Sequence, residues 1–226
     1  MTSLGARLAR AGLAALGILL IAGLLALGTW QVQRRAWKLD LIARVEAGLR
    51  AAPVPPPAAA GPQDAYRRIV ARGIWLAGKD SLVQASTVRG PGWWVMTPLK
   101  ADDGRTILVN RGYVSGYFAP PAPPGRVTVT GLLRLTEPGG GFLRRNDPAA
   151  GRWFSRDVGV IADQRRLKHA APYFIDADSR GNRAGQPVGG LTVVAFANNH
   201  LVYAITWYML AAMTLAALLY WLRAAR

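Results

Sequence analysis

Two apolar stretches decide the organisation of this chain: AGLAALGILLIAGLLALGTW at residues 11–30 and LVYAITWYMLAAMTLAALLYWL at residues 201–222. Neither stretch contains a Lys, Arg, Asp or Glu residue. A helix of about 20 residues, with a rise of about 1.5 Å per residue, crosses the ~30 Å hydrocarbon core of a bilayer and satisfies its own backbone polar groups. The sequence therefore predicts transmembrane helices at residues 11–30 and 200–222.

The first stretch has a second interpretation, as the apolar region of a cleaved signal peptide. Arg7 and Arg10 precede it, and it ends in Ala-Leu-Gly at residues 26–28, which a signal peptidase could accept. The second stretch has no such alternative, because aromatic side chains stand at or near both of its ends, as interfacial anchoring requires. These aromatic residues are Trp207, Tyr208, Tyr220 and Trp221.

The distribution of basic residues predicts the orientation. Arg223 and Arg226 follow the second stretch, whereas residues 184–199 before it contain no Lys or Arg, so we expect the C-terminus in the cytoplasm. The basic residues at 34–44 favour the opposite orientation for the first stretch, but two spans place both termini on one side.

This orientation predicts a multi-pass protein of the inner (cytoplasmic) membrane. Residues 1–10 and 223–226 are then cytoplasmic, and residues 31–199 form an extracytoplasmic domain, periplasmic in a bacterium or in the intermembrane space of a mitochondrion.

Residues 31–199 have the length of one compact domain. They carry 24 of the 28 Lys and Arg residues and all 12 Asp and Glu residues. An extracytoplasmic domain seldom meets nucleic acid, so we expect this charge to face membrane lipids, acidic protein surfaces or propionate-bearing cofactors. An arginine-rich composition without a partner would explain the same excess. The chain contains no cysteine, which excludes disulfides and thiolate metal sites.

The pattern within this segment begins helical. Residues 31–50 keep a rough helical period and extend the first helix, and the prolines of a linker at residues 51–64 end it. A second helix is expected at residues 157–170, with Asp157 as its N-cap and Pro172 just beyond its end.

Short stretches rich in β-branched and aromatic residues predict strands. They lie at residues 67–76, 81–87, 93–99, 106–114, 127–135, 173–176 and 191–195. We interpret residues 78–80 and 102–104 as hairpin connections. The expected fold is thus a membrane protein with two transmembrane helices flanking an α+β, mainly antiparallel-sheet domain, and the pattern allows either a barrel or an open sheet.

The chain has only two histidines. A hydrolytic triad would have to use Ser155, Asp157 and His169, but no G-x-S-x-G motif surrounds any serine, and His169 is explained as a solvated residue at a helix end. His200 stands instead at the extracytoplasmic entrance of the second span, where an imidazole needs a partner or a ligand.

On a helix of 3.6 residues per turn, one face joins His200 to aromatic and small side chains. They are Tyr203, Ala204, Trp207, Ala211 and Thr214. Such a face suits a flat apolar macrocycle whose iron takes an axial base. The alternative is an interfacial histidine that is hydrogen-bonded to Asn198, Asn199 or the opposite helix.

Several motifs in series resemble the Surfeit locus 1 (SURF1) family. LGTWQVQRRAWK at residues 27–38 is similar to its G-x-W-Q-x-x-R-x-x-W-K signature, and VNRGYV at residues 109–114 to its central strand. Residues 142–154, 172–174 and 198–208 resemble the later blocks in family order. Two departures are Tyr113 for the commoner Trp, and a serine after that strand where proline is usual.

The resemblance implies an assembly factor for haem-copper cytochrome c oxidase that is not an enzyme. It implies haem a as the cofactor, with His200 as axial ligand to the haem iron and Trp207 as a second wall of the pocket. The oxidase catalytic subunit is the expected partner, and haem a synthase a further one. Trp30, Gln31 and Arg34 could position the haem or its propionates, although an interfacial aromatic belt with a snorkelling arginine explains them at least as well.

Two rival functions stay open at this point. One is a membrane chaperone that grips the apo-oxidase subunit and never binds haem. The other is a membrane-anchored periplasmic enzyme, which would need several titratable groups close together in a pocket. Asn110, Arg111 and Gly112 of the central strand are expected to serve the fold.

Overall fold

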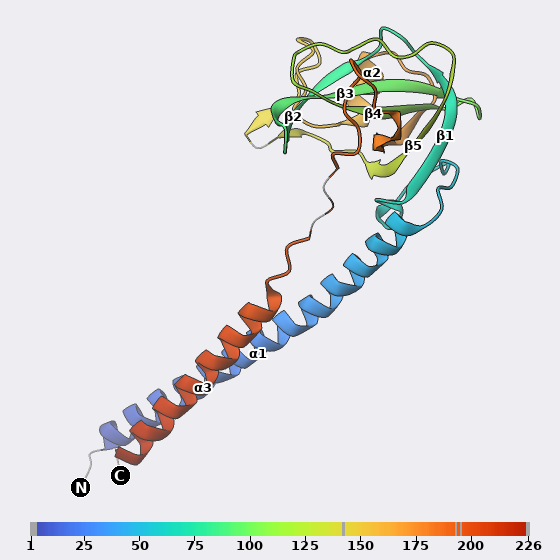
Figure 1. Cartoon of the computed structure of the whole chain (residues 1–226). Helices are drawn as coiled ribbons and strands as arrows, with labels where there is room; N and C mark the ends of the chain where they lie inside the picture. Colours follow the sequence, from blue (N-terminus) through green and yellow to red (C-terminus); the bar gives the residue numbers. More distant parts are fainter. Residues whose placement is uncertain (1–3, 142, 193, 195, 225–226) are drawn as a thin grey trace. The chain divides into compact units, whose positions relative to one another are not determined.

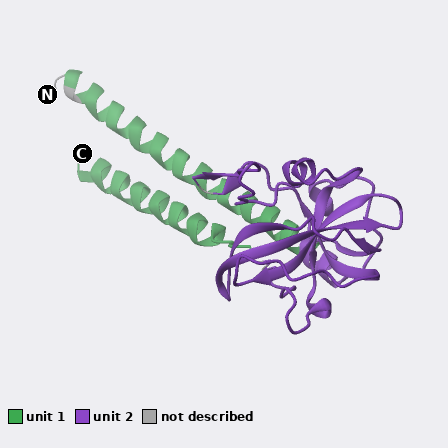
Figure 2. Ribbon diagram, turned by 90° about the horizontal axis from the view of Figure 1, so that it is seen from above, with its two compact units in different colours: residues 1–44, 195–226 green, residues 45–194 purple. Residues whose placement is uncertain are grey.

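The computed structural model describes residues 4–141, 143–192, 194 and 196–224 of the 226-residue chain. The chain forms two compact units, one of residues 1–44 and 195–226 and one of residues 45–194 (Figure 2). The first unit contains two long helices, and the second contains a β-sheet domain.

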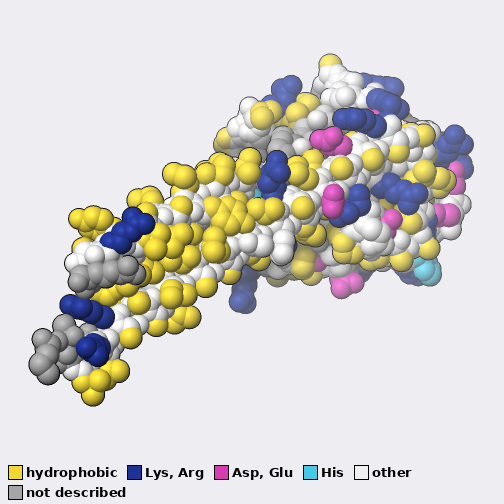
Figure 3. Space-filling model, turned by 90° about the horizontal axis from the view of Figure 1, so that it is seen from below, with side chains coloured by type: hydrophobic (Ala, Val, Ile, Leu, Met, Phe, Trp, Pro, Cys, Tyr) yellow, Lys and Arg dark blue, Asp and Glu magenta, His cyan; other side chains and the backbone are white. Residues whose placement is uncertain are grey.

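The helices of the first unit are α1 (Leu4–Arg50), whose last turns belong to the second unit, and α3 (His200–Ala224) (Figure 1). By length and composition, both are apolar enough to cross a membrane, as predicted. Only 11% of the most apolar window of each helix is buried within the molecule. Figure 3 accordingly shows hydrophobic side chains covering the outside of the helices. They are therefore not the core helices of a soluble protein.

The two helices pack antiparallel through a regular seam. Gly17 faces Leu218, and Gly28 faces the ring of Tyr208 nearer the other end. The less exposed positions of α3 recur every four and three residues, which is the spacing of left-handed helix packing. They are residues 200, 204, 207, 211, 214, 218 and 221. Gly17 and Gly28 leave room on α1 for the Leu218 and Tyr208 side chains of α3.

The second unit is built on a closed barrel. Its strands are β1 (Arg68–Trp75), β2 (Ser81–Thr87), β3 (Gly90–Ala101), β4 (Thr106–Val114), β5 (Arg126–Leu135) and β8 (Ala170–Ala177). The strand order is β1-β5-β8-β4-β3-β2, and β1 also pairs with β3, which closes five strands into a ring. All pairs are antiparallel except β4–β8. The choice between barrel and open sheet is thereby decided for the barrel.

Alternation along the strands gives the barrel two apolar clusters. The inner cluster fills the barrel with fully buried side chains such as Ile69, Leu99 and Tyr173. The outer cluster packs Phe174 and Leu108 under the short helix α2 (Val158–Gln164). Because successive side chains of a strand point to opposite faces, β4 and β8 supply residues to both clusters, and this explains why nearly all of β4 is buried.

Residues 102–104 connect β3 to β4 as a hairpin, as predicted, but residues 78–80 do not connect paired strands. β1 and β2 run in succession along one edge of β3, with Trp75 opposite Leu99 and Ser81 opposite Met96. The hairpin prediction was wrong there because the glycine turn only interrupts a single strand path.

The second predicted helix is shorter than expected. Asp157 caps it, accepting a hydrogen bond from the Val160 amide, but α2 ends at Gln164. Arg166 adopts a left-handed conformation (φ 53°), and the Leu167 amide donates to the Ala162 carbonyl, which closes the helix in a Schellman-like cap.

The strand predicted at residues 191–195 is absent from the described residues 191, 192 and 194, and the other two lie outside them. Thr192 is held by its hydroxyl, which donates to Asp176 at 3.0 Å, and not by strand pairing. The remaining short elements are η1 (Pro62–Asp64), the β6 (Gly140–Gly141) and β7 (Arg144–Arg145) pair, and η2 (Ser179–Gly181).

Candidate functional site

His200 is the first residue of α3, and α1 supplies its partner. The Nδ1 atom of His200 lies 2.7 Å from Oε1 of Gln31. Gln31 is only 9% exposed, because it stands on the seam between the helices. The imidazole therefore has a partner on the opposite helix, which is the contact that the alternative interpretation of an interfacial histidine predicted. The role of His200 as a haem ligand stays a prediction.

This contact favours one tautomer of the imidazole. With the amide oxygen of Gln31 as the contacting atom, Nδ1 is the nitrogen that donates. In the neutral ring the Nε2 atom then keeps its lone pair and can ligate a metal. A buried partner that orients a histidine in this way is the usual supporting contact of metal-bound imidazoles.

A second observation near His200 fits a bound group. The Oδ1 atom of Asn198 is buried and has no hydrogen-bond partner among the described residues. Buried polar atoms nearly always find a partner, so an acceptor without a donor marks a place where a ligand can supply one. Of these two features, the imidazole nitrogen is the one that fits an iron-bearing macrocycle, whereas the Asn198 oxygen would need a hydrogen-bond donor from a bound group.

The other predicted site residues differ in their burial and in whether they lie on the seam. Trp207 lies on the seam with His200 and is partly buried, as the helical face predicted. Tyr203 lies at the margin of that face and is 53% exposed. Trp30 is also 53% exposed, and the guanidinium of Arg34 stacks on the ring of Trp37 at 4.0 Å. The structure thus brings Gln31 to His200, and not its neighbours Trp30 and Arg34.

Close helix packing surrounds this pair. A Cβ atom added to Gly28 would lie 2.8 Å from the ring of Tyr208. The hydroxyl of Tyr208 is 3.1 Å from that of Thr29. Lys38, further along α1, places its ammonium 5.3 Å from the ring centre of Phe196. The glycine, aromatic and polar residues of the 27–38 motif therefore hold α3 in register with α1.

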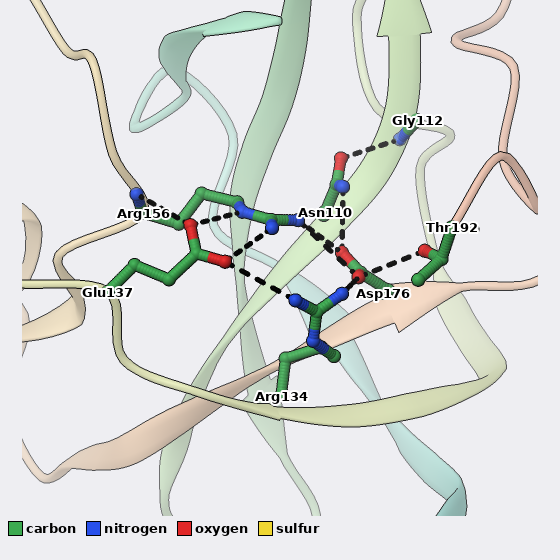
Figure 4. A network of polar contacts seen from close by, with 7 residues as sticks. All are labelled: Asn110, Gly112, Arg134, Glu137, Arg156, Asp176 and Thr192. Carbon is green, nitrogen blue, oxygen red and sulfur yellow. Dashed lines mark hydrogen bonds and ion pairs between the residues drawn. The ribbon is translucent and has the colours of Figure 1, made fainter. Parts of the chain in front are cut away.

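The VNRGYV motif lies on β4 and belongs to a buried polar network (Figure 4). Its centre is Asp176, 2% exposed, which accepts hydrogen bonds from Asn110 at 2.8 Å and Arg134 at 2.8 Å. Arg156 donates to the same carboxylate at 3.1 Å. Asn110 in turn accepts from the Gly112 amide at 3.1 Å.

Charges in this network balance within a small volume. Arg156 bonds Glu137 through two nitrogens, and Arg134 reaches Glu137 at 3.3 Å. Burial opposes the charge of Arg156, but Asp176 and Glu137 outweigh it and raise the pKa of the guanidinium. Two arginines thus face two carboxylates, which is the arrangement of a structural network.

The residues of the hypothetical triad have separate structural partners. The Ser155 hydroxyl accepts from the Gly140 amide and from Asn146, each at 3.0 Å. Asp157 caps α2, and His169 is exposed in a left-handed turn (φ 53°). None of the contacts described for these three residues joins them into a relay.

Comparison with known proteins agrees with the motifs. The sequence model described as the SURF1 family matches residues 18–212. The chain belongs to the SURF1 family. It is 38% identical over 215 residues to human Surfeit locus protein 1, covering 83% of this chain and 70% of the human protein. A SURF1-like protein of Monosiga brevicollis is 36% identical over 213 residues, covering 84% of this chain and 80% of that protein.

The SURF1 match spans both parts of the candidate site. Its limits enclose Gln31 and His200 as well as the whole barrel. Reasoning from sequence placed Gln31 in the signature beside Trp30 and Arg34 but could not choose among them. Gln31 is selected by its place on the buried face of α1, where residues 17, 21, 24, 28 and 31 follow at spacings of three and four, and the structure is what shows which face this is.

Proposed function

We propose that this chain is an assembly factor for haem-copper cytochrome c oxidase that binds haem a at the membrane and assists its insertion into the catalytic subunit. The carrying observation is His200, a histidine at the start of an apolar, outward-facing helix, whose Nδ1 is bonded to Gln31 and whose Nε2 has no hydrogen bond given among the described residues. Membership of the SURF1 family supports the role in cytochrome oxidase assembly. Haem a as the cofactor and the inner membrane as the location are parts of the proposal. The catalytic subunit, haem a synthase and membrane lipids are the proposed partners.

His200, Gln31 and Trp207 would have different roles in binding haem. His200 would ligate the iron through Nε2, and Gln31 would hold the ring so that this atom stays available. Trp207, beside His200 on the seam, would offer an apolar wall. Haem would supply an iron centre that can take an imidazole nitrogen as a ligand.

The apolar exterior of the helices explains why such a carrier belongs in a membrane. Haem is apolar and poorly soluble, and a site at the end of a membrane helix can hand it to a client in the same bilayer without exposing it to water. A single protein ligand would hold the haem loosely enough for transfer. The central domain, on the extracytoplasmic side, would then be free to contact the client.

The test is a visible spectrum of the purified protein. The chain is co-expressed with haem o and haem a synthases, purified in detergent, and compared with His200→Ala and with the matched control His169→Ala. We expect haem a in the wild type and in His169→Ala, and its loss in His200→Ala. Haem retained in His200→Ala would show that His200 is not the ligand. If none of the three proteins contains haem, the function is that of a chaperone that acts through protein contacts alone.

A further inference from the structure

The barrel carries a cleft of about 510 Å³ at one end, distinct from the helix pair. It opens at the end of the barrel where β1 and β8 finish and β5 begins. Trp75, Val127 and Ala177, which pack against the inner core, form its floor. Its size lies within the range of binding pockets, and barrel mouths are a common place for them.

Arg111 of the VNRGYV motif builds one wall of the cleft. Its side chain is 6% exposed and donates to the carbonyls of Pro120 at 2.9 Å and Pro121 at 3.3 Å, and to Gln186. Burial lowers the pKa of the Arg111 guanidinium, and Asp80, 4.0 Å away, opposes that effect only in part. The wall therefore contains a buried guanidinium whose ion-pair partner, Asp80, lies at 4.0 Å.

The segment 178–187, which supplies further lining residues, is held in place by contacts of its own residues and of the residues that follow it. A Cβ atom on Gly112 (φ 133°) would lie 2.3 Å from the Val188 carbonyl carbon, so only glycine allows this approach. Tyr113 and Val188 exchange two backbone hydrogen bonds of 2.9 Å. Asn182 and the Gly189 backbone also bond reciprocally. The cleft is thus preformed.

The cleft runs along a strand edge. β8 pairs with β5 only at residues 131–135, while β1 pairs with β5 along its other side. The Thr130 carbonyl accepts from the Asp178 amide at 2.9 Å, so by alternation the backbone groups of Thr128 point the same way, into the cleft. No strand of the described residues pairs with Thr128 on that side.

Basic side chains surround this edge. Arg126, Arg180 and Arg183 line the cleft with Arg111, against the single acid Asp178. Arg126 pairs with Asp102 and Arg180 with Asp178, but these arginines are 66% exposed, and exposed ion pairs contribute little. An acidic side chain of a bound peptide can therefore replace Asp102 or Asp178 as the partner of these arginines at a small cost in free energy.

We propose that this cleft binds an extended acidic segment of a partner protein, which adds as a strand to the free edge of β5. Strand addition uses backbone hydrogen bonds for affinity, and the arginines select acidic side chains. The five residues 126–130 span roughly 16 Å at about 3.3 Å each, room for four or five peptide residues. The proposal does not depend on haem binding.

The experiment uses the full chain in detergent and fluorescence anisotropy of a labelled acetyl-Glu-Val-Glu-Val-Glu-amide peptide. We expect a Kd of about 1 mM or tighter, weakening with salt, and no binding of the matched peptide with lysine in place of glutamate. Thr128→Pro removes the edge amide and should weaken binding at least about tenfold, while Thr128→Ala keeps it. Arg183→Gln should weaken binding about threefold, and the exposed Arg145→Gln should not.

Each contrary result identifies a different failure. Equal binding of both peptides overturns the charge selection, and equal binding by Thr128→Pro and Thr128→Ala overturns strand addition. Glutarate that competes as well as the peptide makes the cleft a site for small anions. If Thr128→Pro does not fold, as its thermal melt would show, the arginine variants and the lysine peptide still decide the proposal.

Discussion

At the scale of single residues, Gln31 is the side chain with the clearest consequence for the proposed function. It is buried on the helix seam and bonded to His200 Nδ1 at 2.7 Å. Loss of such a supporting contact typically lowers the affinity of a metal site by about 10–100-fold. We therefore predict that Gln31→Leu lowers haem occupancy by a factor in this range.

The control is Gln33→Leu, on the same helix but exposed, which should bind as the wild type does. Haem titration followed by absorbance measures both variants, and Gln31→Glu, which can still accept from Nδ1, should recover most of the affinity. If Gln31→Leu and Gln33→Leu bind haem with equal affinity, Gln31 contributes only to helix packing.

Asp176 is the residue on which the buried network of the barrel depends. It accepts hydrogen bonds from Asn110, Arg134, Arg156 and Thr192. Neutralising it leaves two buried arginines with only Glu137, and breaking a buried ion pair costs about 3–5 kcal/mol. We predict a loss of that size in the unfolding free energy of Asp176→Asn, measured by denaturant titration. Asp163→Asn, at an exposed site on α2, should change it by less than about 0.5 kcal/mol.

Tyr173 gives the barrel a pH dependence on the alkaline side. Its hydroxyl donates to the Pro57 carbonyl at 2.6 Å, and burial raises the pKa of the phenol above the ordinary 10.0, although the Arg105 charge acts against this. The folded state then keeps a proton that the unfolded chain releases. Stability from this group is complete below pH 10 and is lost as the pH rises through the folded pKa.

Wild-type unfolding free energy should therefore fall more steeply above about pH 10 than that of Tyr173→Phe, by up to about 1.4 kcal/mol per pH unit. Urea titrations at several pH values measure the slope. Tyr117→Phe, at an exposed tyrosine, should keep the wild-type slope. Identical slopes in all three proteins would mean that Tyr173 titrates alike in both states.

At the scale of elements, the helix seam makes a sharp prediction at Gly28. A side chain there meets the Tyr208 ring, whereas Gly23 on the same helix has nothing within 4 Å. Overpacking typically costs about 1–3 kcal/mol. Gly28→Val should therefore lower thermal stability in detergent more than Gly23→Val does. In the background of Tyr208→Ala this difference should disappear, since the clash is its cause; its persistence would show that the helices do not pack as described.

Sequence reasoning succeeded where local signals decide an element and failed where pairing decides it. β4 was predicted at residues 106–114 because its β-branched run is flanked by turns, and Asp157 was predicted as a cap from its residue type. The turn at residues 78–80 looks like a hairpin locally, yet only the pairing of both flanking strands with β3 shows that it is not. The end of α2 depended on a left-handed Arg166, a residue type that gives no such signal.

In the candidate site, too, one residue was predictable from local sequence and its partner was not. His200 was found because a ligand-capable side chain is rare in this chain, and it lies on the predicted helix face. Gln31 was not chosen from sequence because the partner of a histidine depends on which face of α1 meets α3. The cleft beside β5 is likewise a consequence of where β8 stops, which no local pattern encodes.

At the scale of the whole molecule, the absence of cysteine allows a direct test of topology. A membrane-impermeant maleimide gives no background, so one introduced cysteine reports one position. Ala149, exposed in a loop of the barrel domain, and Ala224, at the end of α3, should lie on opposite sides of the membrane if α3 crosses it.

In spheroplasts, we predict that Ala149→Cys reacts before lysis and Ala224→Cys only after it. The reason is the positive charge at Arg223 beside an apolar helix, which holds that end in the cytoplasm. The reverse pattern would place the barrel domain in the cytoplasm and separate it from an extracytoplasmic client. Reaction of both cysteines before lysis would mean that α3 does not cross the membrane, and the proposed transfer of haem within one bilayer would then lose its physical basis.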